Sequence, residues 1–271
     1  MAKVRIEKPT TLPEYIDLVN ALGEGAGGKL WFRGCGDSSF ELIPSLYRHR
    51  SAKKPEDFAN LEEQLVTRFK QRSIPYEIRP LSNQWDTLFF MQHYGIPTRL
   101  LDWTENPLTG LHFALMSAQR KVNQAGSKVY EHAAAVWVLD PTIWNTHALS
   151  RQTYNAGPLV HESEELSGYT WRKDFAGMQR LPVGLYGAHN SPRIVAQQGV
   201  FVVFGQDSVP METLYSDSKF PDDCLIKIEI KKNLIGRLRK ALLDIGVTES
   251  IMFPDLDGLA RETRRIFGFD D

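Results

Sequence analysis

The sequence predicts an α+β fold, with a mixed or antiparallel central sheet and flanking helices. Amphipathic helical patterns come first along the chain, and strand patterns then mix with helices. No regular alternation of strand and helix is visible, which disfavours a doubly wound parallel sheet. No repeat or linker divides the 271 residues. We therefore expect one domain over residues 1–271, with a helical part over about 10–95 and a strand-rich part over about 130–231.

Helices are predicted where apolar residues recur every three or four positions between a start signal and a stop signal. In the first helix, Thr11 and Pro13 lie at the start of the apolar stripe and Gly23 ends it. Asn83 can cap the third helix and Gly95 can end it. The helices predicted in this way cover residues 11–23, 55–72, 84–95, 107–118, 233–246 and 253–267.

Strands are predicted at short apolar or alternating runs rich in β-branched and aromatic residues. Residues 193–205 fit two strand pieces that are interrupted at Gln197, Gln198 and Gly199. Residues 150–190 are polar and weakly periodic, so we expect loops there, with a short helix near 160–168. The other predicted strands cover residues 29–34, 133–139 and 224–231.

Composition disfavours several classes of protein. A net charge of -1 argues against a dominant field for nucleic acid or membranes. Cys35 and Cys224 form no CxxC pair, as expected in a reducing compartment. The N-terminus lacks the apolar core of a signal peptide, and the longest apolar run is far too short to span a bilayer. We expect a soluble cytoplasmic protein without a membrane partner.

The common motifs of metal and cofactor chemistry are absent from the sequence. It contains no HExxH, zinc-spaced Cys/His set, GxSxG, Walker A or dinucleotide glycine fingerprint. Zinc peptidases, ordinary serine hydrolases, P-loop NTPases and Rossmann dehydrogenases are therefore disfavoured. Asp255 and Asp257 permit a divalent-ion site, but Asp255 is better interpreted as a helix cap, so we expect no metal.

The stretch WFRG (31–34) places Arg33 near the end of a predicted strand, just before a glycine. A guanidinium has a planar fork of donors that suits phosphate, and the glycine lets a ligand approach the backbone. The alternative is an arginine paired with a carboxylate at the sheet edge. Sequence alone leaves both possibilities open.

The stretch HYGIPTRLLDWT (93–104) is dense in polar groups around a Gly-Ile-Pro turn. A helix starting near Thr104 would offer free amides to an anion. Arg99 and Asp102 are close enough in sequence to pair, and Trp103 offers a face for stacking. Each residue is also open to a structural role, and His93 is either a satisfied buried histidine or a catalytic one.

Gln197 and Gln198 interrupt the apolar run RIVAQQGVF. An unpaired amide buried in a core costs about 1–3 kcal/mol. If both residues lie in a strand, they point to opposite faces. One of the two should then meet a polar cavity, a partner or solvent.

Four stretches together resemble the bacterial FRG-domain family, which is named for the tripeptide found here as Phe32-Arg33-Gly34. They are WFRGCGDSSFELIPSLYR, MQHYGIPTRLLDWTENPLTGLHFA, RIVAQQGVF and IMFPDLDGL, and they span nearly the whole chain. The family resembles a distant relative of the ADP-ribosyltransferase fold. Its members tend to occur in toxin and phage-defence settings. The resemblance implies a split sheet and a cleft that binds NAD.

The resemblance also implies roles for single residues. Arg33 would grip the phosphates or ribose of NAD, and Gln198 would stand where the superfamily usually has a glutamate. Because Gln198 carries no charge, Asp102 could supply the carboxylate instead, and turnover would otherwise be slow or absent. The expected catalytic set is Arg33, Asp102 and Gln198. The expected binding set is Arg33, His93, Tyr94, Thr98, Arg99, Trp103, Thr104 and Gln197.

Three functions therefore compete at this stage. The first is an NAD-consuming enzyme that transfers ADP-ribose to a protein or nucleic acid, or hydrolyses NAD, in a toxin or phage-defence system with a possible inhibitory partner. The second is a nucleotide or nucleic-acid sensor that uses the same cleft without chemistry. The third is a metal-dependent nuclease that uses Asp255 and Asp257.

Overall fold

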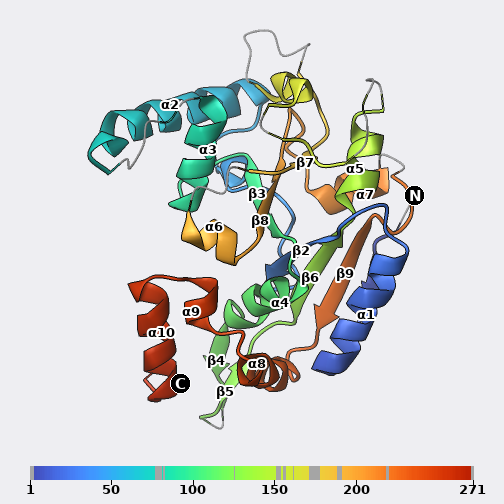
Figure 1. Ribbon diagram of the computed structural model, residues 1–271, viewed down its shortest axis with the longest axis vertical. Coiled ribbons are helices and arrows are strands. Elements are labelled where there is room, and N and C mark those ends of the chain that lie inside the picture. The colour runs from blue at the N-terminus through green and yellow to red at the C-terminus, as the bar shows by residue number, and fades with distance from the viewer. Residues whose placement is uncertain are drawn as a thin grey trace.

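The structure is a computed structural model that describes residues 3–76, 81, 83–124, 126–150, 154, 157–160, 162–170, 178–187, 191–217 and 220–269. Its centre is a seven-stranded sheet in the order β1-β9-β6-β2-β3-β8-β7 (Figure 1). The β1–β9 pair is parallel, and the other neighbours in this sheet are antiparallel. The strands are β1 (Arg5–Glu7), β2 (Trp31–Cys35), β3 (Leu100–Thr104), β6 (Ala134–Leu139), β7 (Val183–Leu185), β8 (Gly199–Val203) and β9 (Leu225–Ile230), with β4 (Arg120–Val122) and β5 (Lys128–Tyr130) in a separate hairpin.

Helices flank this mixed sheet, which confirms the predicted α+β class. None of the helices in the described ranges combines the length and apolar character needed to cross a bilayer. The α-helices are α1 (Leu12–Glu24), α2 (Pro55–Ser73), α3 (Gln84–His93), α4 (Pro107–Met116), α5 (Pro141–Ala148), α6 (Pro192–Ala196), α7 (Met211–Asp217), α8 (Ile235–Asp244), α9 (Glu249–Met252) and α10 (Leu256–Ile266). Short 3-10 turns are η1 (Leu46–Arg48), η2 (Ile74–Tyr76) and η3 (Glu164–Tyr169).

Apolar side chains cover both faces of the sheet. On one face, α1, α4 and α8 pack against β2, β6 and β9, and α3 packs against β3 and β8. On the other face, a cluster rich in tryptophan joins β2, β3 and β6 to α2, α5 and α7. The alternation of side chains along each strand produces this arrangement, because neighbouring residues point to opposite faces.

The sheet is weakest at its middle, between β2 and β3. These two strands share a single residue pair, Phe32 with Thr104. Each is instead fully paired on its outer side, β2 with β6 and β3 with β8. In Figure 1 the β3–β8–β7 part rises with α2 and α3, while β2, β6 and β9 run down beside α1, α4 and α8. The two parts therefore diverge just where Arg33 and Asp102 stand.

Two glycines let α4 lie directly on β2. A Cβ added at Gly34 would stand 2.1 Å from the carbonyl oxygen of Gly110, and a Cβ at Gly110 would stand 2.8 Å from the Cβ of Phe32. Both distances are too short for any side chain. The backbones of strand and helix are thus in contact, which fixes their separation.

A buried ion pair attaches α2 to β3. Arg99, the residue before β3, places its Nε 3.2 Å from Oε1 of Glu62 on α2, and both side chains are almost fully buried. The Arg99 guanidinium also donates to the carbonyl oxygen of Tyr169 and lies over the ring of Trp85. The expected pairing of Arg99 with Asp102 is therefore wrong, because Arg99 points into the interior while Asp102 faces out.

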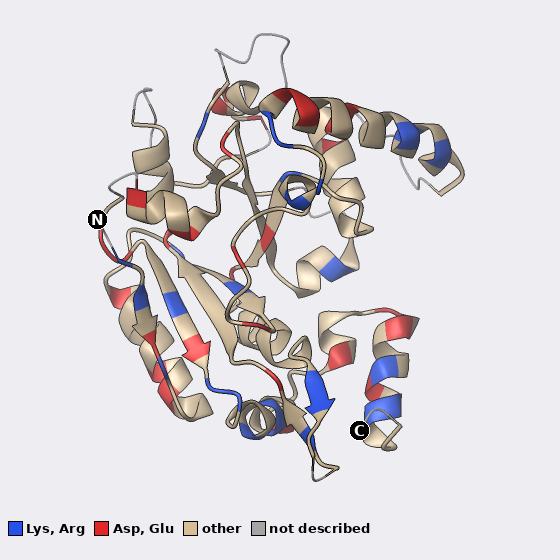
Figure 2. Cartoon of the chain, turned by 180° about the vertical axis from the view of Figure 1, so that it is seen from behind, with Lys and Arg blue, Asp and Glu red and all other residues tan. Residues whose placement is uncertain are grey.

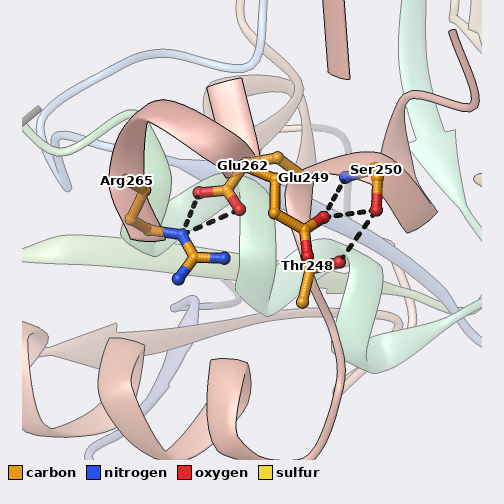
Figure 3. A network of polar contacts seen from close by, with 5 residues as sticks. All are labelled: Thr248, Glu249, Ser250, Glu262 and Arg265. Atoms are coloured by element: carbon orange, nitrogen blue, oxygen red, sulfur yellow. Dashed lines mark hydrogen bonds and ion pairs between the residues drawn. The ribbon is translucent and has the colours of Figure 1, made fainter. Parts of the chain in front are cut away.

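The last two helices form a hairpin held by charged groups (Figure 3). Arg265 on α10 donates to both carboxylate oxygens of Glu249 on α9, at 2.8 and 2.9 Å. Glu262 accepts from the backbone N–H of Ser250 at 3.0 Å and from its hydroxyl. The buried ring of His112 on α4 lies near the start of this hairpin. Glu249 of α9 and the backbone of Val247, just before α9, both raise the pKa of His112 and so favour its charged form.

Most predicted elements are confirmed, including the helices at 11–23 and 55–72 and the caps Asn83 and Asp255. Two are wrong. Leu100–Thr104 is a strand, not the approach to a helix. Of the two caps that the sequence allows for the helix predicted over residues 107–118, Thr104 and Asn106, the structure uses Asn106, and α4 begins at Pro107 as predicted. The predicted strand piece at 193–196 is part of the helix α6, because Ser191 caps it and Pro192 occupies its first turn.

Removing one partner of the buried pair should destabilise the protein strongly. Glu62→Gln leaves the guanidinium of Arg99 without its counter-charge, and we expect a loss of about 3–5 kcal/mol in the free energy of unfolding. Denaturant unfolding followed by circular dichroism measures this. The exposed neighbour Glu63 provides the control, since Glu63→Gln should change little. Equal effects of the two substitutions would contradict the assignment.

The buried His112 should make stability depend on pH. Burial lowers the pKa of His112 from 6.5 to about 4, although Glu249 acts in the opposite direction. The unfolded chain therefore binds a proton below pH 6.5 that the folded chain refuses, and stability falls between about pH 6.5 and 4 by up to about 3 kcal/mol. His112→Gln should flatten this decline, and His49→Gln, at an exposed site, should not. The pH series of unfolding midpoints is the measurement.

Candidate functional site

A pocket of about 270 Å³ lies where β2 and β3 part. Its walls come from segments far apart in the sequence: the middle of β2, the second half of β3, the last turn of α3, the C-terminal part of α4, and α6 with the start of β8. The polar side chains that reach it are those of Arg33, Gln92, His93, Asp102, Thr104, Ser117, Arg193 and Gln197.

Arg33 bridges the gap between the diverging strands. Its Nη1 donates to the carbonyl oxygen of Asp102 at 2.5 Å and lies 4.0 Å from the Oδ2 of the same residue. The guanidinium thus replaces a ladder hydrogen bond that β2 and β3 no longer make. Its Nε is buried without a hydrogen-bond partner among the described residues. Arg33 therefore contacts a carboxylate residue, as in the second alternative, and it also lines the pocket.

Asp102 is held by a short chain of hydrogen bonds. Gln92 Nε2 donates to Asp102 Oδ2 at 2.7 Å, and Gln92 Oε1 accepts from the Thr98 hydroxyl at 2.6 Å. That hydroxyl in turn accepts from the backbone N–H of Leu100 at 3.0 Å. Each donor and acceptor in the chain is therefore assigned. The carboxylate keeps a defined orientation although its side chain is 58% exposed.

Arg193 and His93 also line the pocket, and of the two only Arg193 adds positive charge to it. The Arg193 guanidinium lies 4.6 Å from the ring centre of Phe253. Burial and the nearby Arg261 lower the pKa of Arg193, while Asp102 opposes the shift. Burial also lowers the pKa of His93, helped by Arg193, so the ring is neutral at neutral pH. Among the described residues Arg193 contacts the ring of Phe253 and forms no ion pair with a carboxylate, so its charge is available to a ligand in the pocket.

The two glutamines take different positions. Gln197 ends α6 and lines the pocket, and its Nε2 donates to the carbonyl oxygen of Met252 at 2.8 Å. Gln198 is exposed, lies outside the pocket, and has a left-handed φ of 47°. The expected alternation along a strand is wrong, because the pair lies at a helix end. The segment RIVAQQGVF therefore presents Gln197, and not Gln198, to the pocket.

Several residues of the expected binding set do not meet the pocket. Tyr94 is exposed at the end of α3, Thr98 acts only through Gln92, and Arg99 is buried against α2. Trp103 borders the pocket, but its indole belongs to the apolar cluster on the other face of the sheet. Thr104 also borders it and donates its hydroxyl to the carbonyl oxygen of Gln197 at 2.6 Å.

Arg33, Asp102 and Gln197 thus converge, and Gln92 and Arg193 join them without having been singled out from the sequence. Gln92 lies just before the dense stretch 93–104, so its polar side chain on an apolar helix was a usable signal. Arg193 opens the stretch RIVAQQGVF, in which only the two glutamines were singled out. Together the groups offer two guanidiniums and one oriented carboxylate around a small cavity, which suits an anionic ligand with a sugar hydroxyl or a developing positive charge nearby.

No metal is needed to explain this set. Within the residues that the structure describes, no three His, Cys, Asp or Glu side chains are grouped so as to hold an ion. Asp255 accepts from the backbone N–H of Gly258 at 2.8 Å, as a helix cap does. The nuclease hypothesis built on Asp255 and Asp257 therefore loses the observation that motivated it.

Comparison with protein families finds one match, to the FRG domain, over residues 28–123. The match includes Arg33, Gln92 and Asp102. It ends before RIVAQQGVF and IMFPDLDGL, so those two stretches carry no support from the family model. Searches of curated proteins and of solved structures return no significant match.

The left-handed backbone of Gln198 generates a prediction for stability. Left-handed φ costs a residue with a side chain about 1 kcal/mol, and glycine avoids that cost. Gln198→Gly should therefore raise the free energy of unfolding by about 0.5–1 kcal/mol. Gln197→Gly should lower it, because the bond to Met252 is lost. Thermal unfolding of both variants compares the two, and a destabilised Gln198→Gly would contradict the prediction.

Proposed function

The chain carries an FRG domain over residues 28–123, and we propose that it is an NAD-utilising enzyme that breaks the bond between nicotinamide and ribose. The observation that carries the proposal is the convergence of Arg33, Asp102 and Gln197 on one pocket at the split in the sheet. The order of the three segments is the one that the resemblance to ADP-ribosyltransferases implies, with Gln197 in place of the expected Gln198. The product is ADP-ribose on water, a protein or a nucleic acid.

The two arginines supply the binding of the ligand. Arg33 and Arg193 stand on different walls of the pocket, so a diphosphate between them meets positive charge from both sides. A cavity of about 270 Å³ lies just below the range of roughly 300–1,000 Å³ for ligand pockets. It therefore suits the nicotinamide riboside half of NAD, with the adenosine half extending toward solvent.

Asp102 supplies the negative charge for the chemical step. When the bond between ribose C1′ and the nicotinamide nitrogen breaks, its electron pair stays with the nitrogen and the ribose acquires oxocarbenium-like positive charge. A carboxylate oriented by Gln92 stabilises that charge. The oxygen or nitrogen of the acceptor then bonds to C1′ and loses a proton. This role for Asp102 offsets the lack of a glutamate in AQQG.

Nicotinamide release from NAD tests the proposal. Asp102→Asn should lower the rate by about a hundredfold or more, since it removes the negative charge aimed at the transition state. Arg33→Ala should lower kcat/KM by about a hundredfold or more, since it removes positive charge that holds the diphosphate. Arg180→Ala is the matched control, because Arg180 also pairs with an aspartate but lies on the surface. All variants are first compared by thermal unfolding to confirm that they fold.

The outcomes separate the two functions that share the pocket. No nicotinamide above background with water, protein and nucleic-acid acceptors would refute the enzyme. If NAD still stabilises the wild type and not Arg33→Ala, and is recovered unchanged, the pocket belongs to a nucleotide sensor. A nucleotide sensor is the second candidate because the hydrogen bond from Arg33 to the carbonyl oxygen of Asp102 gives Arg33 a structural role that requires no chemistry.

A further inference from the structure

The helix α10 has an apolar face that no described part of the chain covers. Leu256, Leu259, Ile266 and Phe267 are each more than half exposed, and Phe269 extends the patch beyond the helix. The opposite side of α10 packs on α9. Figure 1 shows the helix at the outer edge of the molecule, beside the C-terminus. A single exposed apolar residue needs no explanation, but a contiguous patch marks a site of association.

The exposed residues have the spacing of a helix–helix seam. Positions 256, 259, 263 and 266 follow the alternating steps of three and four that place side chains along one stripe. Three of the four are leucine or isoleucine, and the fourth is Thr263. Phe267 widens the stripe on one flank. A stripe of this kind fits another helix better than it fits a flat surface.

The charges beside the stripe are self-complementary. Asp257 lies in the first turn of α10 and Arg264 in the last. They are seven residues apart, close to two helical turns, so they stand on the same side of the helix. Figure 2 shows this change from acidic to basic along α10. In an antiparallel pair of such helices, each Asp257 faces Arg264 of the other helix, and the helix dipoles also oppose.

We propose that this face binds a second copy of the chain, through an antiparallel and two-fold symmetric pairing of the α10 helices. The contact is isologous, so the same stripe serves both copies and closes at a dimer. The hairpin of α9 and α10 leaves this stripe exposed to a partner. Arg265 with Glu249 and Glu262 with Ser250 attach α10 to α9 from the side away from the stripe.

Sedimentation velocity of the full chain at increasing concentration tests the pairing. The wild type should shift from one chain of 30.8 kDa toward twice that mass. Leu259→Asp and Phe267→Asp should remain monomeric. Ile74→Asp is the matched control, since Ile74 is comparably exposed but lies at the far end of α2, and it should dimerise like the wild type.

The charged flank is tested by a swap. Asp257→Arg and Arg264→Asp should each weaken the dimer by about two- to fivefold, and the double substitution should restore it. A wild type that stays monomeric at all concentrations overturns the proposal. So does a dimer that survives Leu259→Asp, or a double swap that fails to recover. Binding to anionic vesicles that Leu259→Asp abolishes, without dimerisation, would assign the stripe to a lipid surface instead.

Discussion

One residue pair, Phe32 with Thr104, joins the two halves of the sheet, and the site follows from it. Beyond that pair β2 and β3 cannot exchange ladder bonds, so backbone acceptors at the split need other donors. Arg33 satisfies one of them, the carbonyl of Asp102. A guanidinium has five donors, and a single carbonyl uses one of them. The same side chain that closes the split therefore retains donors for a ligand, and the opening of the sheet becomes the pocket.

The position of α2 beside the strands depends on a buried ion pair between Glu62 and Arg99. The Glu62–Arg99 contact adds a directional polar link to the apolar packing of α2 on the β3 side. A buried pair is demanding in geometry, because each charge is costly without the other. The pair therefore fixes the position of α2 on the strands. Because α3 packs against α2, it also fixes the position of Gln92 and His93 at the end of α3.

The helices and the strands with strong periodicity were predictable, because spacing, caps and glycines agree in them. The errors lie at short segments where tertiary context decides. Leu100–Thr104 carries an aspartate and a threonine that suit a helix start, yet pairing along its whole length with β8 makes it a strand. Ser191 and Pro192 favour a helix turn ahead of Gln197. The apolar residues that follow Pro192 resemble a strand, and for that reason the helix was predicted as a strand.

The site was predictable in its segments but less so in its side chains. The dense motif pointed to Asp102, whereas the partners of each polar group depend on which face of β3 it occupies. The side chains of Arg99 and Trp103 point into the interior. The side chain of Asp102 points out toward the pocket. Arg193 comes from a stretch outside the motif, so only the folded chain brings it to the pocket.

The contact between Gly34 and Gly110 gives the two walls of the cavity different tolerances. On the β2–α4 side, main chain touches main chain at the two glycines, so the separation of strand and helix behind that wall is fixed. On the α3–α6 side, the boundary consists of side chains that can be exchanged one at a time. Substitution can therefore reshape the second wall freely, whereas the first wall can change only through the side chains that it carries, such as Arg33 and Phe113, and not through the spacing of its backbone.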